Sequence, residues 1–486
     1  MTIADEPLEK RWNILETQKS KMNSNEKLQS EDGISRRTFV GGMAAAAGVM
    51  IVPRHVLGGP GYTAPSDKLN IAAVGVGGMG GSNLRQCATT ENIAALCDVD
   101  EEYSSRTFKI YPDAKKYKDW RVMLDKEKGI DAVIVATPDH NHAVIAMACM
   151  KLGKHVYVQK PLTRSIWEAR MLTEAAKKYN VVTQMGNQGH SGEGVRYIQE
   201  WIAAGAIGKV HEVHSWTNRP IWPQGMPRPT DTPAAPPTLD WDVWIGPSPM
   251  RPYNPAYHPW SWRSWWDFGA GALGDMGCHV MDATYTALKL GYPTSVEACI
   301  AYQFVPPPPG GRGFGRRLEY HDSFPIASTV HYTFPARDKK YPAVNYHWYD
   351  GGLLPKRPEE LEPDRRLPES GTIFVGEKGK LMCETYSESP RLIPEAKMKA
   401  FKRPKPTLER FKISHEQIWI QAIKNKGKAT SDFSYAGPFT ETVLLGNLAL
   451  WFAGKKLDWD GPNMKVTNLD EANALVKPQY REGWSL

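Results

Sequence analysis

The sequence predicts an α/β protein in which a parallel, helix-covered sheet precedes a second α/β domain with a large, mainly antiparallel open sheet. Short β-branched runs alternate with amphipathic segments between residues 68 and 188, which is typical of βαβ units. From residue 189 onward, runs that alternate polar and apolar residues predict antiparallel strands with one face turned to solvent or to a ligand.

The first domain, residues 68–188, is expected to be Rossmann-type, because strands joined by helices pair in parallel and are covered on both faces. Its predicted strands are Leu69–Val74, Ile93–Cys97, Ala132–Ala136, His155–Val158 and Val181–Gln184. Its predicted helices begin at Gly80 or cover Asn141–Leu152 and Ser165–Tyr179.

The second domain, residues 189–486, begins with a predicted helix and ends with another. Its expected elements are the helix Gly192–Ala204, the strands Lys209–Ser215, Val296–Phe304 and Ala327–Phe334, and the helix Phe439–Phe452. Long loops interrupt it, and the loop at residues 218–257 is dense in Pro and Trp.

Composition excludes several classes of protein. A net charge of +7 is a mild bias, and the basic residues 397–412 lie close to an acidic run at 359–364, so we read both as solvated surface and predict no nucleic-acid partner. The six cysteines form no C-x-x-C pair, which indicates free, mostly buried thiols.

The N-terminal 65 residues resemble an export signal. Residues 1–34 are charged and expected to be disordered, and residues 35–65 contain Ser35-Arg36-Arg37-Thr38-Phe39-Val40 followed by the apolar run Val40–Val52. That run is too short to span a bilayer comfortably and fits a signal sequence. We therefore expect export by the twin-arginine machinery to the periplasm, with a membrane tether if the signal stays uncleaved. The alternative is an accidental Arg-Arg before an Ala-rich helix.

A glycine fingerprint follows the first predicted strand: Gly75, Gly77, Gly78, Met79 and Gly80. Glycines at these positions allow a tight turn and close approach of a pyrophosphate, which the next helix N-terminus attracts. Asp98 ends the following strand, where a carboxylate hydrogen-bonds a ribose diol and repels a 2′-phosphate. The pattern predicts NAD as cofactor and disfavours NADP.

Three further segments carry candidate chemistry. Thr137, Pro138, His140 and His142 follow a core strand at the crevice edge, as do Gln159 and Lys160 after the next strand, and they are expected near the cofactor. Asp275 and His279 are spaced i, i+4 on a predicted helix, so the carboxylate is expected to raise the basicity of the imidazole and fix its tautomer. Taken singly, Lys160 also fits a surface cation and His279 a packed histidine.

Together these segments resemble the Gfo/Idh/MocA superfamily of sugar and cyclitol oxidoreductases, from about Lys68 to Phe452. The family's Glu-Lys-Pro motif is Gln159-Lys160-Pro161 here, so one carboxylate is lost while the lysine remains. The resemblance implies that Lys160 is the active-site lysine, His279 the base, Asp275 a substrate-binding partner and Asn187 a contact near the nicotinamide. It also implies hydride transfer from a secondary hydroxyl of a sugar, and a homo-oligomer formed through the open sheet.

Substrate contacts beyond these are less determined. Eight tryptophans lie between Trp216 and Trp266, and they fit either a carbohydrate platform or the pinning of long loops. Trp262–Trp266 are the preferred ligand contacts, because they run directly into the segment with Asp275 and His279, and Arg263 among them is expected to reach a substrate hydroxyl or carboxylate. The histidines His140, His142, His190 and His258 lack metal-site spacing, so no metal is predicted.

Three functions stay open. The first is an exported dehydrogenase that oxidises a sugar or glycoside, at C3 in our interpretation, and passes electrons to an acceptor. The second is an NAD-using glycosidase that cleaves by transient oxidation with no net redox change. The third is a cofactor-retaining binding protein, which the presence of Lys160 and His279 disfavours. Export implies that NAD is bound tightly enough to travel with the protein.

Overall fold

The computed structural model describes residues 67–318 and 321–486. The charged segment 1–34 and the twin-arginine region 35–65 lie outside the described residues. Within the described residues, no helix combines the length and the apolarity needed to cross a membrane. All six cysteines are free thiols, and five of them are buried, in agreement with the prediction.

The N-terminal sheet is parallel throughout and has the strand order β3-β2-β1-β4-β5-β6. This is the Rossmann order, in which the chain reverses direction across the sheet between β1 and β4 and opens a crevice at the strand ends. The strands are β1 (Asn70–Val74), β2 (Asn92–Cys97), β3 (Lys115–Tyr117), β4 (Ala132–Val135), β5 (His155–Val158) and β6 (Thr183–Met185).

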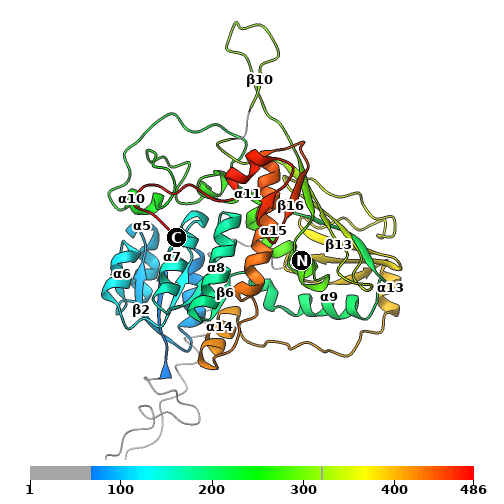
Figure 1. Ribbon diagram of the computed structural model, residues 1–486, viewed down its shortest axis with the longest axis horizontal. Coiled ribbons are helices and arrows are strands. Elements are labelled where there is room, and N and C mark those ends of the chain that lie inside the picture. Colours follow the sequence, from blue (N-terminus) through cyan, green and yellow to red (C-terminus); the bar gives the residue numbers. More distant parts are fainter. Residues whose placement is uncertain (1–66, 319–320) are drawn as a thin grey trace, which may run out of the picture. The chain divides into compact units, whose positions relative to one another are not determined.

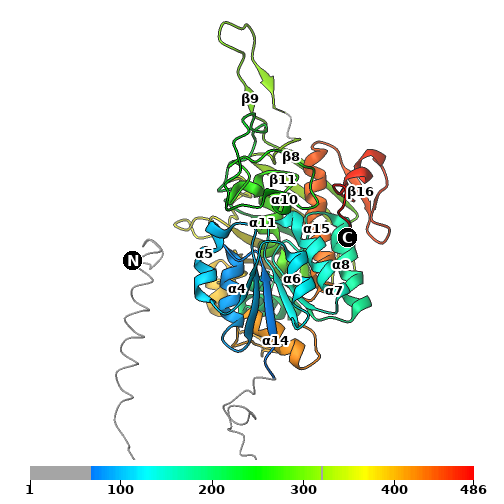
Figure 2. The ribbon, with the colours of Figure 1, turned by 90° about the vertical axis from the view of Figure 1, so that its left-hand side faces the viewer.

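Helices cover both faces of this sheet (Figure 2). Alternate residues of β1 enter two separate cores: Ile71 and Ala73 pack in one, Ala72 and Val74 in the other. The first core is covered by α4 (Met79–Cys87), α5 (Glu101–Ile110) and α14 (His415–Lys424), and the second by α6 (Trp120–Lys126), α7 (Asp139–Lys151) and α8 (Ile166–Tyr179). The parallel, doubly covered sheet is therefore confirmed.

The elements between residues 99 and 131 were not predicted. Helix α5 buries only Ser104 and Thr107 among its own residues, so it has almost no apolar stripe to reveal it. It begins instead at a polar cap, because Asp100 accepts hydrogen bonds from the backbone N–H groups of Glu102 and Tyr103. Helix α6 begins in the same way, with Asp119 as its cap.

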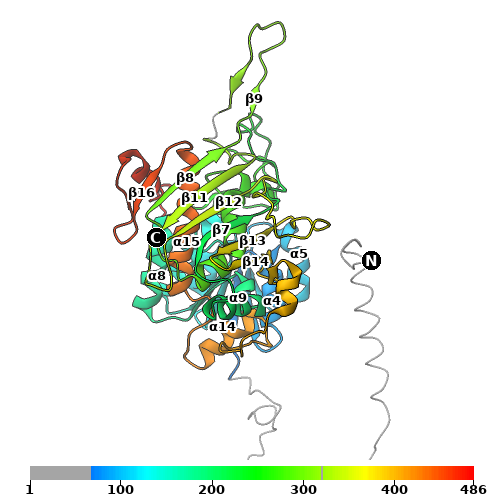
Figure 3. The ribbon, with the colours of Figure 1, turned by 90° about the vertical axis from the view of Figure 1, so that its right-hand side faces the viewer.

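The C-terminal sheet has nine strands in the order β15-β14-β13-β7-β12-β11-β8-β16-β17 (Figure 3). Every pair in it is antiparallel except β7 with β12, which is parallel, so the mainly antiparallel prediction is confirmed. The strands are β7 (Val210–Trp216), β8 (Ser295–Ile300), β11 (Ser328–Phe334), β12 (Val344–Tyr349), β13 (Gly371–Gly376), β14 (Gly379–Glu384), β15 (Arg391–Ile393), β16 (Leu457–Asp460) and β17 (Lys465–Val466).

Two predicted boundaries in this domain were wrong. The strand predicted at Val296–Phe304 ends at Ile300, and Phe304 belongs to a separate ribbon of β9 (Phe304–Val305) and β10 (Arg316–Arg317), which projects in Figure 1. The helix predicted to begin at Phe439 begins at Phe433, because Asp432 caps it upstream of Pro438.

The remaining helices connect the two sheets. Helix α15 (Phe433–Trp451) is buried along most of its length and packs against α8 on one side and β8 and β11 on the other (Figure 1). Helix α11 (Gly271–Val280) packs beside it, at the level of the crevice. The others are α9 (Glu193–Ala203), α10 (Trp241–Ile245), α12 (Asp282–Ala287) and α13 (Glu395–Ala400), with short 3-10 turns at Gln188–Ser191, Ser261–Ser264 and Asp470–Leu475.

The crossing of α15 over α8 depends on one glycine. A methyl group at Gly437 would overlap Thr173 Oγ1, which donates to Ala169 O (2.8 Å) and Phe433 O (3.2 Å). We expect Gly437→Ala to lower the free energy of unfolding by ~1–3 kcal/mol, because the cost of the steric overlap exceeds the gain from the higher helix propensity of Ala. The matched control is Gly427→Ala, where a methyl group meets nothing within 4 Å. Thermal unfolding measures both, and equal melting temperatures for the two variants would contradict the packing argument.

Candidate active site

A cleft of about 440 Å³ opens at the carboxyl ends of β1, β2, β4 and β5, beside helix α11. This is the edge where ligands bind in open α/β sheets, and the volume lies in the range of small-molecule sites. Most of the predicted site residues line it: Gly75, Gly77, Gly78, Met79, Asp98, Thr137, Pro138, His142, Gln159, Lys160, Trp262, Arg263, Asp275 and His279.

The glycine turn after β1 has the geometry of a phosphate cradle. Gly75 adopts φ +80°, and a methyl group there would lie 2.6 Å from Ala136 O at the end of β4. A methyl group at Gly77 would overlap the Tyr103 ring, and one at Gly80 would overlap Gly75 O. Helix α4 begins at Met79, and its cap residue Gly78 has no side chain, so no side-chain oxygen competes with an anion for the first N–H groups of the helix. These residues fit the pyrophosphate of a dinucleotide.

Asp98 lines the cleft at the end of β2 but also holds the glycine turn. Its Oδ2 accepts hydrogen bonds from Val76 N (2.7 Å) and Gly77 N (3.1 Å), and its Oδ1 accepts from Asp100 N (3.1 Å). Burial raises the pKa of Asp98, although the three backbone N–H donors act to lower it. A carboxylate has about four lone-pair sites, so Asp98 keeps acceptor capacity toward the cleft.

Lys160 and Asp275 meet across the two domains. Lys160, directly after β5, donates from Nζ to Asp275 Oδ1 (2.6 Å) and to Asp275 O (3.0 Å). Arg263 Nε lies 3.4 Å from the same Oδ1. Burial opposes the ionisation of Asp275, but the charges of Lys160 and Arg263 outweigh it and lower the pKa of Asp275 to about 2. An ammonium group has three donors, so Lys160 keeps one for a ligand.

His279 lies one turn after Asp275 on α11. The i, i+4 spacing predicted that the carboxylate would fix the tautomer of the imidazole, but the two side chains are not hydrogen-bonded. Asp275 is taken by Lys160, and Nδ1 of His279 is buried without a hydrogen-bond partner. Burial and the charge of Lys160 lower the pKa of His279 to about 3, although Asp275 acts in the opposite direction. Tyr386 packs its ring edge against the imidazole at 4.9 Å. The imidazole is therefore neutral and oriented by packing.

Asp139 belongs to the same site and was not predicted as a site residue. It begins α7, lines the cleft and is 4% exposed. Burial raises the pKa of Asp139 to about 7, although Arg263 and Lys160 act in the opposite direction. The sequence did offer one indication of this role, because Asp139 stands between Pro138 and His140, which were both predicted to lie near the cofactor. Its carboxyl group changes charge near neutral pH within the cleft.

Gln159 replaces a glutamate of the family motif, and the structure gives a reason. Its Nε2 donates to Asn83 Oδ1 (2.9 Å) on α4, and Asn83 Nδ2 donates to Glu416 Oε1 (2.6 Å) on α14. All three side chains are buried. A carboxylate at position 159 would lack the donor that Asn83 Oδ1 needs and would add a second buried negative charge beside Glu416.

His140 and His142 face in different directions. His140 does not line the cleft: its Nδ1 lies 3.1 Å from Phe268 O and its Nε2 2.8 Å from Trp244 O. His142 lines the cleft and bridges two loops, with Nδ1 2.9 Å from Pro161 O and Nε2 2.8 Å from Thr137 O. His140 therefore fastens the second domain, while His142 positions the segment that carries Lys160.

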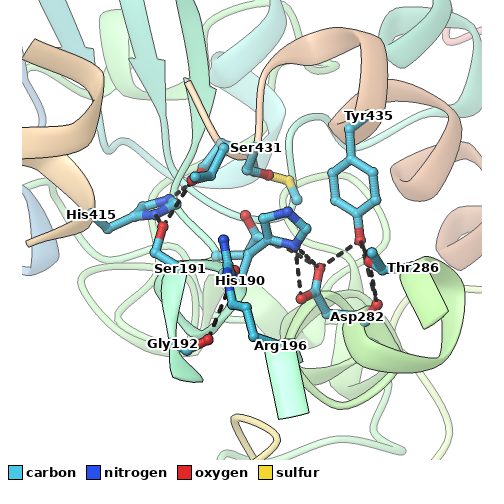
Figure 4. A network of polar contacts seen from close by, with 12 residues as sticks. His190, Ser191, Gly192, Arg196, Asp282, Thr286, His415, Ser431 and Tyr435 are labelled. Atoms are coloured by element: carbon cyan, nitrogen blue, oxygen red, sulfur yellow. Dashed lines mark hydrogen bonds and ion pairs between the residues drawn. The ribbon is translucent and has the colours of Figure 1, made fainter. Parts of the chain in front are cut away.

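Asn187 also lies outside the cleft lining and bonds to Asp282, which belongs to a buried polar network with His190 and Tyr435 (Figure 4). Its Nδ2 donates to Asp282 Oδ1 (3.0 Å), and its own Oδ1 is buried without a partner. Asp282 also accepts from Tyr435 Oη (2.7 Å) and contacts His190 Nδ1 (2.9 Å). The network joins α12 to α15 and to the turn after β6, and it fixes the position of Asn187.

The tryptophans divide between the two alternatives. Trp222, Trp244, Trp260 and Trp262 line the cleft, and the guanidinium of Arg263 lies 4.1 Å from the centre of the Trp262 ring and 4.9 Å from that of Trp260. Trp265 and Trp266 do not line the cleft, so their prediction as ligand contacts was wrong: Trp265 is fully buried and Trp266 packs against Phe324. Trp260 is half exposed and presents an aromatic surface at the cleft.

Residues 218–268, which we name the strap, close the cleft on the side of β2. Asp240 N donates to Val99 O (2.9 Å), Glu101 N donates to Thr238 O (3.3 Å), and His258 Nε2 lies 2.8 Å from Asp100 Oδ2. Burial opposes the ionisation of Asp100, but the hydrogen bond with His258 prevails and its pKa is lowered. Sequence reasoning placed this segment only as a loop, because its partners lie more than a hundred residues upstream.

Both domains match models of one protein family. Residues 69–187 match the NAD-binding Rossmann fold of the Gfo/Idh/MocA oxidoreductase family, and residues 208–301 match its C-terminal alpha/beta domain. The two matches cover the crevice glycines, Lys160, Asp275 and His279.

Curated relatives and solved structures agree with this match. A levoglucosan dehydrogenase of Pseudarthrobacter phenanthrenivorans is 28% identical over 38% of this chain and 40% of its own, and a myo-inositol 2-dehydrogenase of Thermotoga maritima is 25% identical over 32% and 47%. The chain thus aligns with less than half the length of these relatives. The WlbA dehydrogenase of Bordetella pertussis, solved with NADH and UDP-GlcNAcA, shares the fold with a TM-score of 0.53, 15% identity and coverage of 81% of this chain and 99% of that one. Over residues 69–187 and 208–301 the chain is thus similar to the Gfo/Idh/MocA family of oxidoreductases.

Proposed function

We propose that this protein is an NAD-dependent oxidoreductase that acts on a secondary hydroxyl of a sugar or glycoside. The observation that carries the proposal is the arrangement of Lys160 and His279 at one end of a cleft that begins at the glycine turn. One side chain is a cation with a free donor, and the other is a neutral imidazole that lines the same cleft. A hydroxyl group placed between them has a donor for its oxygen and an acceptor for its proton.

The glycine turn and the uncapped start of α4 would hold the cofactor's pyrophosphate, and Asp98 would accept from its ribose hydroxyls. We assign NAD in preference to NADP, because the carboxylate of Asp98 at the end of β2 would repel a 2′-phosphate. When bound, the nicotinamide supplies the hydride acceptor of the reaction.

The residues of the chain divide the remaining work. His279 takes the hydroxyl proton as general base, while Lys160 stabilises the negative charge that develops on the oxygen. Asp275 holds Lys160 in place through the 2.6 Å contact and stays ionised, since the pKa of Asp275 is about 2. Arg263 and the Trp260 and Trp262 rings offer a polar group and flat apolar faces, the combination that binds a pyranose ring.

The relatives support the substrate class. The levoglucosan and inositol dehydrogenases both act on ring-shaped polyhydroxyl compounds, according to their names. For this chain we propose a sugar or glycoside, with oxidation at C3 as the specific form of the reaction. We also propose that the twin-arginine segment directs the protein to the periplasm with its cofactor already bound.

A redox-neutral glycosidase is the second candidate, and the strap favours it. The strap is attached at Val99, Asp100 and Glu101, directly after Asp98, so it lies beside the place where the cofactor's ribose would bind. A cofactor that does not leave must regain its oxidised state in place. The cycle would close either when the hydride returns to the sugar, after elimination of the aglycone and addition of water, or when a second substrate accepts the hydride.

The two functions differ in their products. Purified protein is incubated with a panel of glycosides, with and without added NAD or an artificial electron acceptor, and the products are resolved by mass. A ketosugar lighter by two hydrogens supports the dehydrogenase, whereas free aglycone without net redox change supports the glycosidase. Neither product from any sugar, together with no bound dinucleotide, contradicts both.

Substitutions at the two central residues give the first prediction. We expect His279→Ala to lower kcat/KM by ~10²–10⁴-fold and Lys160→Met by ~10²–10³-fold, because one loses the base and the other the stabilising charge. Dinucleotide binding, followed by fluorescence, should persist in both. The control is His211→Ala, an exposed histidine on β7. Retention of full activity in either cleft variant would remove that residue from the mechanism.

The pH profile separates His279 from Asp139 as the base. Because the pKa of His279 is about 3, a rate that needs its neutral form stays level from pH 8 down to about 5. Because the pKa of Asp139 is about 7, a rate that needs its carboxylate falls about tenfold per pH unit below 7. We expect the level profile for kcat/KM, and a fall below pH 7 that Asp139→Asn abolishes would transfer the role to Asp139.

The strap gives a prediction about cofactor retention. His258→Ala removes the buried contact with Asp100 while Asp100 keeps its bonds to the α5 backbone. We expect the variant to release NAD about 10–100-fold faster, since a hydrogen bond to a charged group contributes ~1.5–3 kcal/mol. The release rate is measured by displacement with excess cofactor analogue, with His211→Ala again as control. Equal release rates would show that the strap does not retain the cofactor.

A further inference from the structure

The C-terminal sheet carries a cluster of metal-ligating side chains away from the cleft. Glu212 and His214 lie on β7, two residues apart and therefore on one face of the strand. Strand β12 pairs with β7 in parallel, and the register places His347 directly opposite His214. None of these three residues lines the cleft. In Figure 3 the strands β7, β12 and β11 lie side by side.

The distances among these side chains match a metal's ligand set. Glu212 Oε1 lies 3.1 Å from His214 Nε2 and 3.4 Å from His347 Nε2, and the three ligand atoms all lie within 4.8 Å of one another. Tetrahedral bonds of ~2.0–2.2 Å place neighbouring ligand atoms roughly 3.3–3.5 Å apart. The side chains thus need only small movements to bind one ion in common.

The other nitrogen of each imidazole is already held. His214 Nδ1 lies 3.1 Å from Tyr349 Oη, and His347 Nδ1 lies 2.7 Å from His331 Nδ1 on β11. Such contacts fix the tautomer of a metal-bound histidine and leave Nε2 with its lone pair toward the ion. Both rings also stack at 4.9 Å, nearly parallel, which keeps their Nε2 atoms on the same side.

We propose that Glu212, His214 and His347 bind one divalent transition-metal ion of the Zn²⁺ class. Two imidazoles and one carboxylate suit Zn²⁺, whereas Mg²⁺ and Ca²⁺ require mainly oxygen ligands. The side chains of the three ligands are 37%, 21% and 22% exposed, so the fourth position is open to water. Lys380, whose charge acts on His214, is itself paired with Glu360 at 2.6 Å and does not occupy the site.

Such an ion would fasten the parallel pair β7–β12 at the centre of the sheet. A ligand that binds the folded chain and not the unfolded one raises stability by mass action. The site therefore has a structural effect that can be measured apart from the reaction in the cleft, and it does not depend on the proposed function.

The test uses the full chain without a polyhistidine tag, stripped with a chelator and titrated calorimetrically with Zn²⁺ alone. We expect one Zn²⁺ per chain at micromolar affinity or tighter, and a higher melting temperature with Zn²⁺. His214→Ala and His347→Ala should each weaken binding at least about 100-fold, and His331→Phe by ~10–100-fold through loss of the contact to His347 Nδ1.

The control is His211→Ala, a histidine on the same strand outside the cluster, which should bind Zn²⁺ as the unchanged chain does. Circular dichroism and retained dinucleotide binding show that each variant is folded. The proposal is overturned if the stripped chain takes up no stoichiometric Zn²⁺, or if the cluster variants bind it as tightly as His211→Ala.

Discussion

The contact between Lys160 and Asp275 is the constraint on which the site depends. It joins the end of β5 in one domain to α11 in the other, and both side chains are largely withdrawn from water. A buried charge without a partner costs several kcal/mol, so each domain supplies the ion that the other requires. Arg263 contacts the same carboxylate of Asp275, and these contacts set the orientation of α11. His279 lies on the next turn of this helix and therefore reaches the cleft.

The cost of burying an unpaired charge also explains why Gln159 stands where the motif has a glutamate. Helix α14 returns to the N-terminal sheet from far along the chain and brings Glu416 next to Asn83. Asn83 Nδ2 already donates to Glu416, so Asn83 Oδ1 needs a donor, and the Gln159 amide provides it. The substitution is therefore explained by a helix outside the motif, and Lys160 is left unchanged beside it.

The sequence was sufficient for features that depend on neighbours along the chain. The hydrophobic runs gave the strands β1, β4 and β5 to within a residue or two, and the glycine spacing placed the turn after β1. Contacts between distant segments were out of reach. The sequence could not predict that His140 contacts Trp244 O and Phe268 O, or that Asp139 is buried near Arg263. Both depend on how the strap folds back onto the N-terminal domain. The cluster of Glu212, His214 and His347 depends on the register of a parallel pair, which no local spacing reveals.

The strap links the chemistry to the supply of cofactor. It is fastened at β2 through Val99 and Asp100, at α7 through His140, and near the C-terminal tail, where Arg481 Nη1 donates to Asp242 Oδ1 (2.6 Å). These separate attachments hold the strap in place, so we propose that a bound dinucleotide exchanges slowly. A slow exchange restricts the enzyme to cycles in which the hydride is returned or handed to a second substrate in the same cleft.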